Sequence, residues 1–212
     1  MKKLLTEIND TIRQNKFNYL IILLFLCIGI VFGVCSVKYM NGADKNDLIN
    51  YFNTFMEGTR NETINYSDLL FSVVTKVLFI FIPVLVLGYT FWGTPVILII
   101  VFIKGFTLGY TFSFLINTLE QKGILLALAS IIPQNIIYIP CLILISIISI
   151  KTANYRFRKR FLKNKNNSMI IEPCGKIIFT LMIFCAVAVL IETFICPRLI
   201  KIIVWEVNIR RG

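Results

Sequence analysis

Histidine is absent from the 212-residue sequence, and charged residues are scarce. Without histidine, the chain cannot form most zinc sites, His-based catalytic sets or the HExxH pattern. Only 16% of the residues are charged, whereas soluble domains average about 25%. Long stretches carry almost no charge, and 57% of all residues are hydrophobic. This pattern is typical of a protein that crosses a membrane several times.

Other signatures of catalysis are missing from the sequence as well. It contains no G-x-x-x-x-G-K-[ST] phosphate loop, and no aspartate falls within an apolar run. The cysteines form no C-x-x-C pair and lie mostly within or beside apolar runs, which favours a role as small apolar fillers. We therefore expect no catalytic residue, no metal site, no cofactor and no enzymatic activity. The six cysteines are Cys27, Cys35, Cys141, Cys174, Cys185 and Cys196.

Five apolar runs are long enough to cross roughly 30 Å of hydrocarbon at about 1.5 Å per helical residue. The first is too long for the apolar part of a signal peptide, so we expect it to remain as a span. Only Trp92–Pro95 separates the second from the third, which favours a tight turn, with a re-entrant pair as the alternative. We predict an all-α, polytopic membrane helical bundle with about five transmembrane helices, forming a single membrane domain over residues 1–212. The expected spans are residues 17–37, 69–91, 96–116, 124–148 and 177–197.

The formal net charge of +11 is concentrated beside the apolar runs. This distribution favours contact with the anionic lipid bilayer and argues against a nucleic-acid partner. With five spans, the positive-inside rule places residues 1–16 and the basic loop 151–176 in the cytoplasm. The net-acidic loop 38–68 is then extracytoplasmic, as is the tail 198–212, although the tail's own basic residues oppose that placement. We expect the tail to lie on the membrane surface or to fray.

Three ionisable residues fall inside the expected spans, where each costs about 2.5–3.5 kcal/mol to insert. Lys76 is near enough to the outer surface for its stem to reach the headgroups. Lys104 lies deeper and shares a helical face with Thr107 and Thr111, whose hydroxyls could bond a neighbouring helix. Glu192 lies in the outer half of the last span. A Lys104–Glu192 pair would give each residue a counter-charge, but their depths differ, so the pairing stays open.

Two patterns of small residues follow helical spacing. GIVFG, Gly29–Gly33, lies in the first span, and GFTLG, Gly105–Gly109, directly follows Lys104. Glycines four residues apart let two helix backbones approach closely. We expect these glycines to pack helices together. A specific dimer face, and hence a homo-oligomer, is the alternative.

The run SIIPQNIIYIP, Ser130–Pro140, places two prolines near the middle of the fourth span. Each proline lacks a backbone donor. Pro133 therefore frees the carbonyl of Ala129. Pro140 likewise frees the carbonyl of Ile136. In hydrocarbon these carbonyls need new partners.

Polar side chains of the same run could meet this need. Gln134 and Asn135 offer amide donors at the depth of the prolines. Ser130, Gln134 and Tyr138 recur every four residues and form one polar stripe. We therefore predict a broken or tightly packed helix that faces other helices, with Lys104 on a neighbouring span as a partner.

The stretch Gly93–Ser146 resembles stage II sporulation protein M of spore-forming Firmicutes. The matching pieces are FIKGFTLGYTFSFL and KGILLALASIIPQNIIYIP, and the last span ending in IETFICP is similar too. The resemblance implies a multi-pass protein of the mother-cell membrane at the sporulation septum. There it would localise and anchor the peptidoglycan-degrading stage II sporulation proteins D and P during engulfment. The resemblance assigns no catalytic residue.

The candidate helix-packing or partner-interaction residues combine the positions that match this family with two further polar residues. A membrane scaffold is the first hypothesis for their role. A subunit of a transporter or channel is the alternative, because broken helices and charges at mid-depth are features of transporters. The presence of only five spans and no visible repeat counts against it, although oligomerisation could supply the rest. The candidates are Lys104, Gly105, Gly109, Ser130, Pro133, Gln134, Asn135, Pro140 and Glu192.

Overall fold

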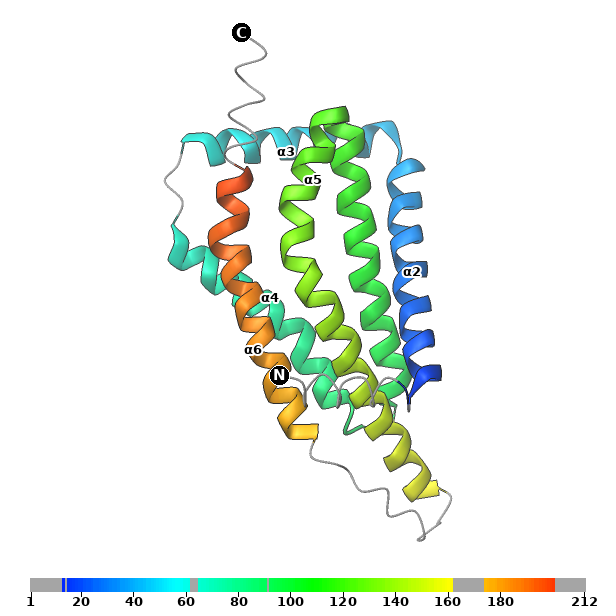
Figure 1. Ribbon diagram of the computed structural model, residues 1–212. Helices are drawn as coiled ribbons and strands as arrows, with labels where there is room; N and C mark the ends of the chain where they lie inside the picture. Colours follow the sequence, from blue (N-terminus) through cyan, green and yellow to red (C-terminus); the bar gives the residue numbers. More distant parts are fainter. Residues whose placement is uncertain (1–12, 14, 62–64, 91, 162–173, 201–212) are drawn as a thin grey trace.

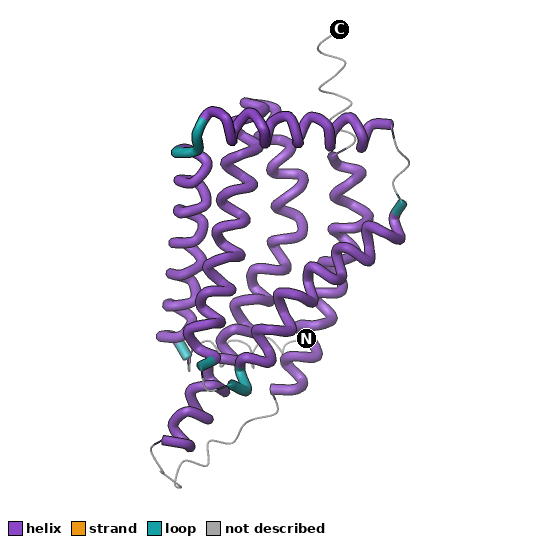
Figure 2. Tube along the Cα trace, turned by 180° about the vertical axis from the view of Figure 1, so that it is seen from behind, coloured by secondary structure: helices purple, strands orange, loops and turns teal. Residues whose placement is uncertain are grey.

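The computed structural model describes residues 13, 15–61, 65–90, 92–161 and 174–200, and within these ranges it contains helices and no strand (Figures 1 and 2). Five helical segments are long and apolar enough to cross a membrane, which confirms the all-α prediction with five candidate spans. The elements in chain order are α2 (Lys16–Lys38), α3 (Gly42–Asn61), α4 (Tyr66–Leu87), α5 (Gly93–Phe161), α6 (Cys174–Leu190) and the π-helical turn η1 (Ile191–Ile195).

Helix α5 supplies two of the spans. Its first half, Gly93–Thr118, and its second half, Ile124–Arg156, are each long enough to cross a membrane. The chain reverses direction between them, so the two halves lie side by side, with α2 against the first half (Figure 1). The last span, Ile177–Ile200, combines α6, η1 and the helical residues that follow.

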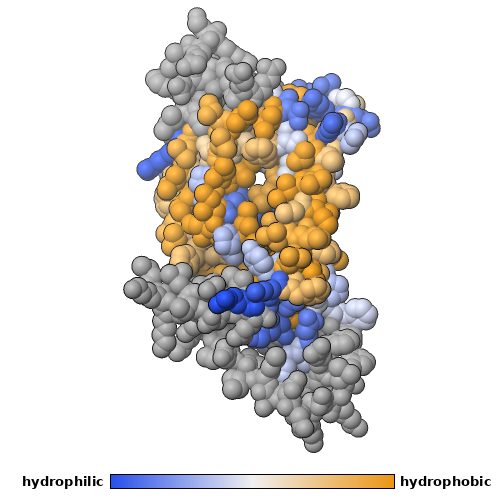
Figure 3. All heavy atoms as spheres, turned by 45° about the vertical axis from the view of Figure 1, so that its right-hand side comes forward, coloured by the Kyte–Doolittle hydropathy of each residue, from blue (hydrophilic) through white to orange (hydrophobic). Residues whose placement is uncertain are grey.

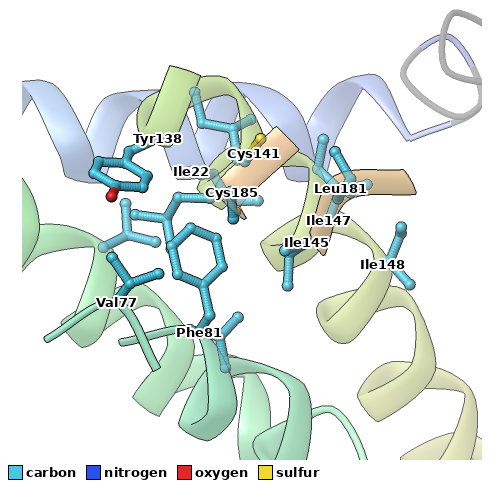
Figure 4. Close-up of a cluster of buried hydrophobic side chains, with 14 of the residues drawn as sticks. Ile22, Val77, Phe81, Tyr138, Cys141, Ile145, Ile147, Ile148, Leu181 and Cys185 are labelled. Carbon is cyan, nitrogen blue, oxygen red and sulfur yellow. The ribbon is translucent and has the colours of Figure 1, made fainter. Parts of the chain in front are cut away.

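The second half of α5 is the central helix of the bundle. Of its most apolar stretch 61% is buried inside the protein, compared with 22–28% for the other four spans. Figure 4 shows its side chains Tyr138, Cys141 and Ile145 within the main apolar cluster, with Phe81 of α4 and Cys185 of α6 nearby. The polar run Ser130–Pro140 therefore lies on the most enclosed span, as its predicted packing against other helices requires.

The outer helices turn large apolar side chains away from the bundle. Phe17, Phe71, Phe79 and Phe179 are all highly exposed. On the face that Figure 3 shows, apolar residues form a band across the middle of the molecule, with hydrophilic atoms mostly toward the ends. Contact of this band with the hydrocarbon interior of a bilayer is favourable, whereas its exposure to water would be unfavourable.

The connection between α4 and α5 is a tight turn. Backbone hydrogen bonds close it, including Gly88 N–H to Leu85 O at 3.2 Å and Gly93 N–H to Thr90 O at 3.2 Å. A Cβ at Gly93 would collide with the carbonyl of Leu87, so glycine is the residue that fits there. The guanidinium of Arg156, at the far end of α5, lies 4.8 Å from the ring centre of Tyr89 in the same turn.

The connection between α2 and α4 contains a helix that the sequence did not predict. Helix α3 lies across one end of the bundle (Figures 1 and 2). Asn65 then caps α4, because its Oδ1 accepts a hydrogen bond from Ser67 N–H at 3.3 Å. The polar composition of α3 hid it from a search for apolar runs.

The ends of the helices alternate between two sides of the bundle, as five crossings require. α2 begins on the same side as the α4–α5 turn and the end of α5, while α3 and the reversal of α5 lie on the opposite side (Figure 1). The basic segment 151–176 begins within α5, which continues to Phe161. The predicted N-terminal segment 1–16 and surface tail 198–212 lie mostly outside the described residues.

Candidate functional site

The two glycine patterns pack against each other within one chain. A Cβ on Gly29 would collide with the carbonyl of Phe102, and one on Gly105 would collide with the carbonyl of Leu26. Gly33 and Gly109 make equally close approaches one turn further along their helices. The structure therefore uses all four glycines to join α2 to the first half of α5. These glycine faces are occupied inside the protein, so they do not form an open dimer surface.

Four helical segments bring polar side chains together inside the bundle, and we call this group the polar cluster. Lys76 comes from α4, Lys104 from the first half of α5, and Glu192 and Thr193 from η1. The second half of α5 contributes the remaining members. Contacts and charge effects join Lys76, Lys104, Tyr138 and Glu192. We include Gln134, Asn135 and Thr193 because each lies within four residues of Tyr138 or Glu192 along the chain and has a buried side-chain oxygen without a partner among the described residues.

An ion pair joins α4 to the last span within the polar cluster. The ammonium of Lys76 donates a hydrogen bond to Glu192 Oε1 at 3.1 Å. The Lys76 side chain is 57% exposed, whereas that of Glu192 is only 11% exposed. The Lys104–Glu192 pairing considered from the sequence is therefore not the one the structure forms. The direct partner of Glu192 is Lys76, which we had expected to reach the headgroups instead.

Lys104 contacts the second half of α5. Its ammonium lies 5.9 Å from the ring centre of Tyr138, a cation–π geometry. It is also near enough to Lys76 and Glu192 for both charges to act on it. The expected partnership of Lys104 with the polar run is thus realised through the aromatic ring.

Thr107 and Thr111 share a helical face with Lys104, and their hydroxyls were expected to bond a neighbouring helix. Thr107 donates to the carbonyl of Ile103 at 2.9 Å, and Thr111 donates to the carbonyl of Thr107 at 2.8 Å. Both hydroxyls therefore bond their own helix, as threonines commonly do in apolar surroundings. The proposed hydrogen bonds to a neighbouring helix are wrong.

Helix α5 continues through Pro133 and Pro140 without a break. Asn135 Nδ2 donates to the carbonyl of Ile131 at 2.7 Å, and Ser130 Oγ donates to that of Leu126 at 2.7 Å. These acceptors lie four residues before each donor, so they are not the carbonyls that the prolines free. Of the two predicted outcomes, the tightly packed helix is the one observed. For Ser130 and Asn135 the proposed route for satisfying the freed carbonyls is wrong.

Several buried polar atoms of the cluster have no hydrogen-bond partner among the described residues. Tyr138 is 5% exposed and Thr193 is fully buried. Unpaired polar atoms inside a protein are costly, and in a bilayer no bulk water offsets the cost. These atoms are Gln134 Oε1, Asn135 Oδ1 and the Thr193 hydroxyl, together with Glu192 Oε2 and the Tyr138 hydroxyl, which lie near each other without full hydrogen-bond geometry.

The π-helical turn η1 is the feature of the site that the sequence did not reveal. It places Glu192 and Thr193 on the inner side of the last span, and Phe194 stacks on Tyr66 at a centroid distance of 5.6 Å. Such turns insert one extra residue into a helix and are frequent at functional sites. Neither glycine nor proline marks its start, so no local signal could have found it.

Five of the cysteines are free thiols, of which Cys141, Cys185 and Cys196 are buried and Cys27 and Cys35 are exposed. Figure 4 shows Cys141 and Cys185 among apolar side chains, where small fillers are expected. Within the described ranges, no group of three or more His, Cys, Asp or Glu residues could hold a metal ion.

Comparison with known families matches residues 22–197 to stage II sporulation protein M. No curated protein and no solved structure matches the chain. The matched residues include all of the polar cluster and the four packed glycines, and they reach from the first candidate span into the last.

Proposed function

The chain belongs to the stage II sporulation protein M family, and on that premise we propose that it is a membrane scaffold. It localises and anchors a peptidoglycan-degrading complex at the sporulation septum during engulfment, in the mother-cell membrane. Its partners are stage II sporulation proteins D and P. Family membership carries this proposal, because it makes the chain a sporulation-related protein, and its five apolar helices make it a multi-pass membrane protein.

The architecture supports a role in holding other proteins. The apolar band fixes the bundle in the bilayer, while α3 lies across one end of it. The basic end of α5 lies on the opposite side, so the positive-inside rule puts α3 on the extracytoplasmic side. Peptidoglycan lies on that side, which makes α3 the surface we assign to partner contact.

A matched pair of substitutions tests this assignment. Tyr51 on α3 is 75% exposed, and Tyr39, just beyond the end of α2, is 79% exposed. We expect Tyr51→Glu to reduce co-purification of the D and P proteins at least several-fold and to disperse them from the septum. Tyr39→Glu places the same charge on the same side but off α3, so it should retain them.

Deletion of the gene sets the reference for this experiment. Fluorescent fusions of both hydrolases would be followed in sporulating cells that lack the chain. Septal localisation and mutual co-purification that persist after deletion would show that the protein is not their scaffold. Gly105→Leu is unsuitable here, because Gly105 packs directly on α2 and its loss would disturb the bundle itself.

One observation favours the second candidate function, a transporter or channel subunit. Four helical segments converge on the polar cluster inside the apolar band, as helices do around the substrates of transporters. The scaffold proposal expects liposomes with purified protein to release trapped phosphate no faster than protein-free liposomes. Release that depends on the protein, disappears in Lys104→Met and persists in Lys151→Met would instead favour the transporter.

A further inference from the structure

We propose that the polar cluster binds a phosphate group that also carries hydroxyl donors, with the Lys104 ammonium as its main anchor. The group can belong to free hydrogen phosphate or to a lipid headgroup such as phosphatidylglycerol. This site is separate from the α3 surface, and it stands whether the protein acts as a scaffold or as a transporter.

The polar cluster has a net positive charge, which favours the binding of an anion. Lys76 and Glu192 neutralise each other at 3.1 Å. Lys104 has no carboxylate within salt-bridge distance in the described part of the chain, and its close neighbour is the face of the Tyr138 ring. Lys104 is half-buried, and an ammonium without a counter-charge is unfavourable in apolar surroundings. One bound negative charge would bring the cluster close to neutrality.

The unpaired atoms call for a ligand with both donors and acceptors. The Tyr138 and Thr193 hydroxyls can donate to anionic oxygens, as can the Lys104 ammonium. Glu192 Oε2 and Asn135 Oδ1 can only accept, so they require donors on the ligand. A simple carboxylate offers no donor, whereas hydrogen phosphate and a glycerol phosphate headgroup each offer hydroxyls beside anionic oxygens.

The positions of these atoms suit a shared ligand. Asn135 and Tyr138 are three residues apart on one face of the central helix, and both are 5% exposed. The Tyr138 hydroxyl faces the Glu192 carboxylate closely enough for its charge and a weak hydrogen bond to act on it, although the pair falls short of full hydrogen-bond geometry. The second half of α5 and the last span thus meet at Tyr138 and Glu192, and the proposed ligand would bind there beside Lys104.

The cluster is reachable from outside the bundle. Lys76 carries its charge half-way along α4 and is 57% exposed, so one side of the cluster opens toward the surroundings. A lipid headgroup or a small anion does not need the bundle to unfold in order to enter.

The test uses full-length protein in nanodiscs and measures its midpoint of thermal unfolding. One arm titrates inorganic phosphate against chloride at constant ionic strength in phosphatidylcholine nanodiscs. The other arm replaces phosphatidylcholine stepwise by phosphatidylglycerol without free phosphate. We expect a rise in midpoint in at least one arm, because a ligand that binds the folded state stabilises it. A rise with phosphate alone identifies the free anion, and a rise with phosphatidylglycerol alone identifies the headgroup.

Two substitutions assign the effect to the site. Lys104→Met should weaken the apparent affinity about tenfold or more, as expected for the loss of a charge-assisted hydrogen bond. Lys151→Met removes a lysine near the end of the second half of α5 and should bind like the wild type. Should Lys104→Met fail to fold, Tyr138→Phe keeps the ring, removes the hydroxyl and should weaken binding several-fold. An unchanged midpoint in both arms, or equal affinities for wild type and Lys104→Met, would overturn the proposal.

Discussion

Replacing Gly109 by alanine should destabilise the protein by about 1–3 kcal/mol, the usual cost of overpacking a tight interior. A Cβ at this position would lie 2.9 Å from the backbone carbon atoms of Ile30. Backbone cannot rotate out of the way as a side chain can, so α2 and the first half of α5 would have to separate. Gly33→Ala should behave in the same way, because its Cβ would lie 2.6 Å from the backbone nitrogen of Tyr110.

Gly175 provides the matched control for this prediction. It lies in α6, and a Cβ there meets nothing within 4 Å. Gly175→Ala should therefore raise the stability by up to about 1 kcal/mol through helix propensity alone. Thermal unfolding in one detergent would be measured for all three variants. Equal midpoints for Gly109→Ala and Gly175→Ala would mean that the glycine contact between α2 and α5 does not hold the fold together.

Removing the charge of Lys76 should cost more stability than removing the charge of Glu192, its partner in the intramembrane ion pair. Lys76→Met leaves the Glu192 carboxylate buried without its cation, whereas Glu192→Gln leaves an exposed ammonium that can move. Removing one partner of a fully buried pair costs about 3–5 kcal/mol. Because Lys76 is partly exposed, we expect about 2 kcal/mol for Lys76→Met and less than about 1 kcal/mol for Glu192→Gln.

The double variant separates this explanation from a general loss of packing. Lys76→Met combined with Glu192→Gln removes both charges, so it should recover most of the stability lost in Lys76→Met alone. Unfolding midpoints of the wild type, both single variants and the double variant complete the cycle. Additive losses would show that charge pairing between α4 and the last span contributes nothing to stability.

The spans were predictable because crossing a bilayer depends on the length and composition of a local run. The expected third span, 96–116, lies within the observed Gly93–Thr118, and the expected last span, 177–197, lies within Ile177–Ile200. Helix α3 escaped prediction because its sequence is polar on average, so no long apolar run marks it. Composition alone could not separate it from a loop.

The partners within the site were less predictable because they depend on how the helices tilt and cross. Lys104 and Glu192 each needed a counter-charge, but only the path of α4 decides that Lys76 reaches Glu192 first. The glycine patterns predicted close helix packing, but they did not predict that the two patterns would pack against each other. The Asn135 amide donates to a carbonyl of its own helix, because that acceptor is within reach whatever the neighbouring helices do.

The central position of the second half of α5 has a consequence for biosynthesis. Translation delivers the spans in chain order, so this helix emerges fourth, after three of its neighbours. Its polar stripe can meet Lys104 as soon as it leaves the insertion machinery, without a period alone in lipid. Lys76 remains without its carboxylate partner for longer, because Glu192 is synthesised only with the final span. A chain truncated before that span would keep an uncompensated charge in the bilayer, a mark by which membrane quality control can recognise unfinished copies.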